Sequence, residues 1–215
     1  MADISMYDDL VVRQQVERIE VFTGLETKNR YTVMTPQEET VLYAYEESGF
    51  WSRQFLGTHR PLTINVMDIE GKTVHIASRR FFWFFSRLHV RDASGRALGS
   101  LRRRFSVFTR RLSLEDGNGQ VIAEVKGPFF RPYTFMVYQQ GMEVARLTKR
   151  WSGVLREAFT RADTFQVQFS GPSRDRDFAS LVLAASFAID LDFFERRKGR
   201  GSGGSSWSGS SSAHR

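Results

Sequence analysis

Residues 178–189 (FASLVLAASFAI), near the end of the chain, limit the possible folds more than any other feature. They contain no Gly or Pro, and apolar side chains on every side of a helix are typical of a buried or membrane-spanning segment. A membrane span needs roughly 20 apolar residues, whereas this run is shorter and is followed by Asp190 and Asp192. We therefore expect a core helix at about residues 178–195, with a membrane-inserted helix as the alternative.

A hairpin pattern repeats through the middle of the chain. An alternating strand, a turn and a second strand recur in INVMDIEGKTVHIA, LHVRDASGRALGSL, LSLEDGNGQVIAEV and FMVYQQGMEVARL, and less regularly in YTVMTPQEETVLYAYE. Asp-x-x-Gly turns supply an Asp that bonds its own backbone and a glycine that adopts positive φ, as hairpins require. This spacing, with one more strand at TFQVQF, predicts a mainly β, antiparallel fold. A closed barrel would surround the apolar helix.

The two ends of the chain differ from this middle part. Residues 1–10 are expected to be a flexible N-terminus, and they lack the basic and apolar regions of a signal peptide. Residues 198–215 form a Gly/Ser-rich tail that cannot bury enough apolar surface to stay ordered. The folded domain is therefore expected over residues 11–197, with a short helix at residues 151–163.

Positive charge is concentrated in one part of the chain. The protein has a net charge of +7, and residues 79–111 contain ten Arg, no Lys and a single acid, Asp92. Such a block attracts polyanions, which means nucleic acid or an anionic membrane surface. A solvated basic face without a partner is the remaining alternative.

Five consecutive aromatic residues, at positions 81–85, lie inside this basic block. Rings flanked by arginines suit a membrane interface, where the rings enter the headgroup region and the guanidinium groups bind phosphates. In a strand, Phe81, Trp83 and Phe85 would share one face, and Phe82 and Phe84 the other, so we expect one set inside the fold and the other exposed. The candidate lipid-binding residues are Arg79, Arg80, Phe82, Trp83, Phe84, Arg87, Arg102, Arg103, Arg104, Arg110 and Arg111.

Two alternative classes of function remain open, and a third, enzymes, finds little support in the sequence. RRRFSVFTRRLSL interleaves arginines with Phe105 and Phe108, which fits single-stranded nucleic acid, although strand geometry predicts that some of these rings fill the barrel. A scaffold barrel that binds lipid or protein without moving lipids is the other alternative. The sequence has no cysteine, four isolated histidines and no nucleophile-elbow, P-loop or dinucleotide motif, so we do not expect an enzyme.

Several blocks of the sequence resemble one known family, in the same order. They include QQVERIEVFTGLETKNRYTV, GTHRPLTINVMD, RWSGVLREAFTRADTFQVQF and FAIDLDFFE. With these blocks, the chain resembles the phospholipid scramblase family over nearly the whole folded part. The resemblance implies a barrel of about twelve strands around a hydrophobic C-terminal helix, as in the tubby C-terminal domain. It also implies calcium-stimulated movement of phospholipids between leaflets without ATP, and tubby-like relatives bind phosphoinositide headgroups through basic residues.

The calcium-linked segment of that family is degenerate here. Where family members with this segment carry Asp at its first, third and twelfth positions, this chain has Arg161, Asp163 and Pro172. Calcium takes six to eight oxygen ligands, which Asp163 alone cannot supply. Asp163 is therefore the one candidate metal ligand. Calcium is the one cofactor that the resemblance implies, its segment is degenerate in this chain, and we expect no other cofactor.

Together, the residues and the resemblance predict a phospholipid scramblase-like protein. We expect it to bind anionic phospholipids at the cytoplasmic face of a membrane such as the plasma membrane, as a peripheral or shallowly inserted barrel. Movement of phospholipids between leaflets is the further expectation. Nucleic acid is the less favoured partner, and the sequence does not specify an oligomeric state.

Overall fold

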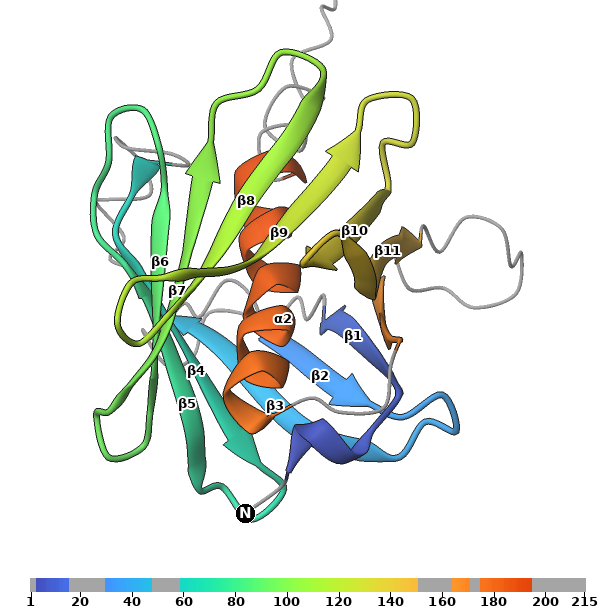
Figure 1. The fold of residues 1–215 in the computed structure, drawn as a ribbon. Coiled ribbons are helices and arrows are strands. Elements are labelled where there is room, and N and C mark those ends of the chain that lie inside the picture. Colours follow the sequence, from blue (N-terminus) through green and yellow to red (C-terminus); the bar gives the residue numbers. More distant parts are fainter. Residues whose placement is uncertain (1–2, 16–29, 48–58, 151–163, 171–174, 195–215) are drawn as a thin grey trace, which may run out of the picture.

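Twelve antiparallel strands form a closed barrel around one helix (Figure 1). The computed structural model describes residues 3–15, 30–47, 59–150, 164–170 and 175–194. The strands are β1 Asp9–Gln15, β2 Arg30–Met34, β3 Thr40–Glu47, β4 Leu62–Asp68, β5 Thr73–Arg79, β6 Arg87–Asp92, β7 Ala97–Arg104, β8 Thr109–Asp116, β9 Val121–Pro128, β10 Thr134–Gln139, β11 Met142–Arg150 and β12 Thr164–Phe169. The predicted mainly β barrel of about twelve strands is confirmed.

The predicted hairpins form as expected, because their turns are encoded locally. In the turn between β4 and β5, the Asp68 carboxylate accepts hydrogen bonds from the backbone N–H groups of Glu70 and Lys72, at 3.1 and 2.9 Å. Gly71 takes a φ of +80° in the same turn, a region that favours glycine. The β6–β7 and β8–β9 turns repeat this arrangement with Asp92 and Asp116.

Strand β1 closes the barrel, and the sequence pattern alone did not predict it. It pairs antiparallel with β12 on one side and with β2 on the other. The segment before it also differs from the flexible N-terminus expected for residues 1–10. Residues Ile4–Met6 form a 3-10 helix capped by the Asp3 side chain, and Ile4 is fully buried in the core.

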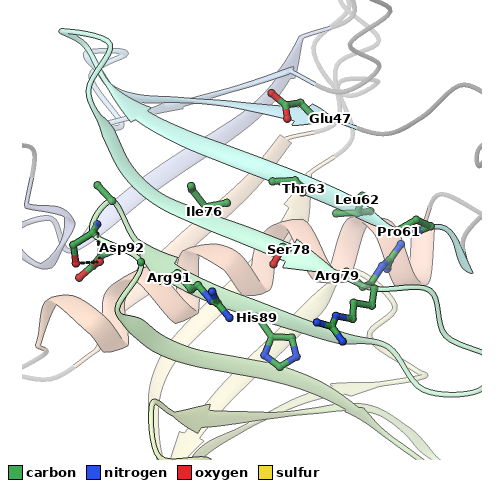
Figure 2. A pocket seen from close by; sticks show the side chains of 14 residues that line it. Glu47, Pro61, Leu62, Thr63, Ile76, Ser78, Arg79, His89, Arg91 and Asp92 are labelled. Atoms are coloured by element: carbon green, nitrogen blue, oxygen red, sulfur yellow. Dashed lines mark hydrogen bonds between the residues drawn. The ribbon is translucent and has the colours of Figure 1, made fainter.

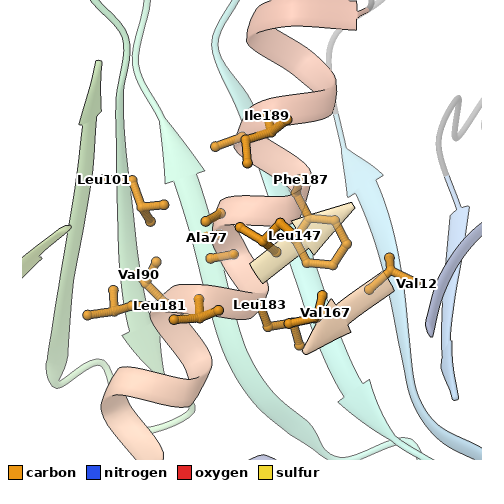
Figure 3. Close-up of a cluster of buried hydrophobic side chains, with 14 of the residues drawn as sticks. Val12, Ala77, Val90, Leu101, Leu147, Val167, Leu181, Leu183, Phe187 and Ile189 are labelled. Atoms are coloured by element: carbon orange, nitrogen blue, oxygen red, sulfur yellow. The ribbon is translucent and has the colours of Figure 1, made fainter. Parts of the chain in front are cut away.

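The apolar segment is a helix inside the barrel, as predicted. Helix α2 spans Arg176–Ile189 and continues as a π-helical turn, η4, over Asp190–Phe194. Figure 3 shows Leu181 on the side of Val90 in β6, whereas Leu183 lies near Val167 in β12. Each of the helix residues from Phe178 onward is buried, so every face of the helix packs against strands. Among the described residues, no helix has the length and hydropathy that a bilayer span requires.

Candidate functional site

Three loops, which alternate along the chain with the β6–β7 and β8–β9 turns, project from one end of the barrel. They connect β5 to β6, β7 to β8 and β9 to β10, and comprise residues 80–86, 105–108 and 129–133. Alternate connections of an antiparallel barrel emerge at the same end, and these six strands are neighbours in the order β5 to β10. Figure 1 shows the three loops together at the top, where the helix also ends. We call this end, with its three loops, the aromatic end.

Exposed aromatic side chains gather in these three loops. Trp83 and Phe84 are 77% and 83% exposed, Phe108 is 82% exposed and Phe130 is 81% exposed. In the described part of the chain, every exposed Phe or Trp lies in one of these three loops. The other exposed rings of the loops are Phe81, Phe85, Phe105 and Phe129, and Val107 is exposed beside them. Exposed apolar side chains concentrated at one end of a fold are typical of a protein or membrane interaction site.

The aromatic run is a loop, so the expected alternation between its two faces is wrong. Phe81, Trp83, Phe84 and Phe85 are all exposed, and none of them points into the barrel. Phe82 is the exception: its ring is half-buried, 5.0 Å from the Arg79 guanidinium carbon. The expectation that Phe105 or Phe108 fills the barrel is also wrong, because both lie in the β7–β8 loop with exposed rings.

The predicted arginines divide into two groups, and the first faces the barrel interior. Arg79 is buried and donates to the Asp192 carboxylate at 2.8 Å. Arg103 lies over the Phe193 ring of η4 at 5.1 Å, and Arg110 lies over the Phe135 ring of β10 at 4.4 Å. These three cations contact the end of the helix or the rings around it, and direct contact of Arg79, Arg103 and Arg110 with lipid stays a prediction.

The second group surrounds the aromatic end on its outer face. Arg80 and Arg102 are exposed, and neither has an acidic partner among the described residues. Arg87 and Arg104 share one buried carboxylate, Glu115, so this cluster keeps one net positive charge. Arg111 and Lys126 likewise share Glu124, whose pKa they lower by hydrogen bonding. Arg131 adds an exposed cation beside the Phe130 ring.

An open groove of about 1350 Å³ runs along the outer face of the strands next to the aromatic run. Thr63, Ser78 and His89 are paired across β4, β5 and β6 and form one row of its polar lining. Arg80 and Arg91 add positive charge at its edge. Figure 2 shows that His89 and Arg91 extend from β6 on the same face as Ser78. Sequence reasoning missed this groove, because it depends on the pairing register.

The surroundings of His89 lower the pKa of its imidazole. Partial burial lowers its pKa, and the nearby Arg87, Arg91 and Arg80 lower it further, while Glu115 opposes them. An anion in the groove would meet the guanidinium groups of Arg80 and Arg91 beside this imidazole, and also the carboxylates of Glu47 and Asp92, which line the same groove. An anion bound there would in turn favour protonation of His89.

The opposite end of the barrel has a different chemistry. Its turns carry the Asp-x-x-Gly sequences and exposed ion pairs such as Lys72–Glu70 and Arg13–Glu38. Single exposed apolar residues occur there, for example Ile69 at 66% exposure, but the described turns at this end carry no exposed Phe or Trp. The two ends of one barrel therefore present an aromatic and a polar surface, and we call the second the polar end.

A comparison with family models identifies the chain's family. The model named Scramblase matches residues 1–196. The chain belongs to the scramblase family. Phospholipid scramblase 1 of Mus musculus is 28% identical over 207 residues, covering 90% of this chain and 63% of that protein. Phospholipid scramblase 2 of Homo sapiens is 26% identical over 211 residues, covering 91% of this chain and 70% of that protein.

Two further matches are more limited. A phospholipid scramblase family protein of Schizosaccharomyces pombe is 36% identical over 94 residues, covering 41% of this chain and 25% of that protein. A solved Arabidopsis thaliana structure aligns with a TM-score of 0.46 and 15% identity, covering 86% of this chain and 91% of that one. The match to the mouse protein covers less than two thirds of that protein's length. The activity of these longer relatives is therefore not assigned to this chain on the basis of the shared fold.

The metal ligand predicted from the resemblance to scramblases lies outside the described residues. Asp163 and the short helix expected at residues 151–163 are not described, and neither is the tail at 198–215, so these remain predictions. Within the described ranges, no three His, Asp or Glu side chains are grouped so that they could hold a metal ion. Sequence reasoning missed Phe129, Phe130 and Arg131, although two adjacent aromatics beside an arginine repeat the pattern of the aromatic run.

Proposed function

We propose that this scramblase-family barrel docks on anionic phospholipid membranes with its aromatic end. The observation that carries the proposal is the concentration of exposed rings in three adjacent loops. Phe and Trp rings are favourable at the bilayer interface, where apolar area leaves water and the ring edges stay near the headgroups. The exposed cations around the rings add attraction to an anionic leaflet, about 1 kcal/mol for each cation near the surface.

The groove beside the aromatic run is suited to a phospholipid headgroup. In the docked orientation, Arg80 would lie at the membrane surface, and Arg91 and His89 would follow along the outer face of the barrel. Guanidinium groups bind phosphate oxygens with good geometry. A headgroup would thus find charge compensation while its acyl chains stay in the bilayer.

Movement of phospholipids between leaflets is the further part of the proposal. The main barrier is the transfer of a charged headgroup through hydrocarbon, because burying an unpaired charge in an apolar medium costs a large free energy. A polar groove next to inserted rings that thin or distort the bilayer would lower this barrier without ATP. A barrel that binds lipid without moving it remains the alternative within the same site.

The first test is flotation of the full chain with vesicles of phosphatidylcholine alone or with phosphatidylserine, over a salt series. We expect binding to the anionic vesicles that weakens as salt rises. Single-stranded DNA is added as a competitor, because exposed rings beside arginines also suit stacked bases. Absence of vesicle binding together with tight DNA binding would contradict the proposal. Dithionite quenching of fluorescent lipid in reconstituted vesicles then separates lipid movement from binding alone.

A further inference from the structure

Both ends of the aromatic run are fixed by the same side chain. Arg79, just before the run, donates to one oxygen of the Asp192 carboxylate at 2.8 Å. Ser86, just after the run, donates its hydroxyl to the other oxygen. The Arg79 and Asp192 side chains are each only 2% exposed. Asp192 belongs to η4, so a residue at the end of the central helix closes the base of the loop at residues 80–86.

Contacts inside the loop carry this fixation toward the exposed rings. The Phe82 ring lies 5.0 Å from the Arg79 guanidinium and 4.9 Å from the His59 ring, and its backbone oxygen lies 3.1 Å from His59 Nδ1. On the other side, the Ser86 carbonyl accepts a hydrogen bond from the Arg103 N–H at 2.9 Å. The half-buried Phe82 therefore acts as the inner anchor, and the other four rings extend into solvent.

A second buried carboxylate at the same helix end has no such link to the aromatic run, although the backbone N–H of its partner Lys149 donates to the Tyr133 carbonyl of the β9–β10 loop at 2.8 Å. Asp190 accepts a hydrogen bond from Lys149 Nζ of β11 at 2.7 Å and one from the Tyr31 hydroxyl of β2 at 3.4 Å. Neither partner belongs to the loops of the aromatic end. Asp190 and Asp192 are thus two buried acids, each paired with a buried cation, and they differ in whether the partner adjoins the aromatic run.

We propose that Asp192 is a positioning residue that couples the end of the central helix to the membrane-docking loop. While η4 is seated, Arg79 and Ser86 hold the loop with its four outer rings presented together. If η4 moves, both ends of the loop are released at once. A pre-ordered loop loses less conformational freedom on binding than a released one, so the helix end controls the affinity of the aromatic end for a bilayer. This inference rests on the proposed membrane docking.

The test uses the absence of cysteine from the chain. A single Phe84→Cys substitution in the full chain carries a nitroxide label, and Asp192→Asn is compared with the matched control Asp190→Asn in this background. For Asp192→Asn we expect greater label mobility in the absence of lipid and roughly tenfold weaker partitioning to phosphatidylserine-containing vesicles. Asp190→Asn should leave both quantities unchanged, although it also breaks a buried ion pair.

Each outcome decides a separate question. Equal label mobility and equal partitioning in the two Asn variants would overturn the coupling, because both lose a buried charge partner. If Asp192→Asn does not fold, Ser86→Ala provides the same comparison, since it releases one end of the loop and keeps the Arg79 pair. If the unsubstituted chain does not bind vesicles, the proposed docking fails, while label mobility still shows whether Asp192 orders the loop.

Discussion

At the scale of single residues, neighbouring arginines have opposite roles. Arg79 is the last residue of β5 and points inward to Asp192, whereas Arg80 is exposed at the start of the loop. The sequence shows only two adjacent cations, and it cannot show which one meets a carboxylate more than 100 residues away. The basic character of the region was therefore predictable, but its division into interior and surface cations required the tertiary structure.

This division predicts different consequences for two adjacent substitutions. Arg79→Gln should lower the free energy of unfolding by about 3–5 kcal/mol, because it leaves the buried Asp192 without its cation. Arg80→Gln should change it by less than about 0.5 kcal/mol, as is usual for an exposed site. Urea denaturation followed by circular dichroism measures both. Equal effects of the two substitutions would contradict the placement of Arg79.

His75 gives the fold a specific sensitivity to acid. It is fully buried, its two ring nitrogens have no hydrogen-bond partner in the described part of the chain, and burial followed by repulsion from Arg176 lowers its pKa to about 4. Since the folded state binds the proton less readily than the unfolded state, this residue lowers stability as pH falls from about 6.5 to about 4. The loss approaches about 3 kcal/mol at the acid end.

The substitution His75→Leu should remove this contribution. Melting temperatures of the two proteins are compared at pH 7.5 and pH 4.5. The difference between these two pH values should be smaller in the variant than in the unsubstituted chain. The same pH dependence in both proteins would mean that other groups cause the acid sensitivity.

At the scale of elements, local sequence predicted the hairpins and failed where the partner is distant. The turns at Asp68, Asp92 and Asp116 are encoded within four residues, so the flanking strands were predictable. Strand β1 joins the sheet through β12, which is more than 150 residues away in the chain. The aromatic run was assigned to a strand because a continuous apolar run does not distinguish a buried strand from a loop that leaves the barrel.

The aromatic loops should contribute to membrane binding through their exposed rings. We expect the double substitution Trp83→Ser and Phe84→Ser to reduce partitioning to anionic vesicles at least tenfold, at roughly 1–2 kcal/mol for each partly inserted ring. Ile69→Ser at the polar end is the control, because Ile69 is 66% exposed. Vesicle sedimentation measures the partitioning. An equal loss in the control would argue against docking through the aromatic end.

At the scale of the whole molecule, the barrel has two chemically different ends. The exposed rings, the outer arginines and the end of the helix lie at the aromatic end, whereas the polar end carries the Asp-x-x-Gly turns and ion pairs such as Lys72–Glu70, and its described turns have no exposed Phe or Trp. A net charge of +7 therefore understates the asymmetry of the surface. This asymmetry could not be predicted from composition, because it arises from the way barrel topology sends alternate loops to opposite ends.

The asymmetry of charge predicts a position-dependent response to salt. Arg80→Gln with Arg102→Gln should weaken binding to anionic vesicles by about 2 kcal/mol at low salt and flatten its salt dependence. Arg13→Gln with Lys72→Gln removes the same charge at the polar end and should have a much smaller effect. A similar weakening in both double variants would mean that binding depends on net charge without a defined orientation.

Docking through the aromatic end is tested most directly by labels at the two ends of the barrel. The chain lacks cysteine, so Phe84→Cys and Asn118→Cys each give one site for an environment-sensitive fluorophore, at the aromatic end and at the polar end. On addition of phosphatidylserine-containing vesicles, we predict a blue shift of the emission at position 84 and none at position 118. Binding that shifts the emission at position 118, or at both positions alike, would contradict this orientation.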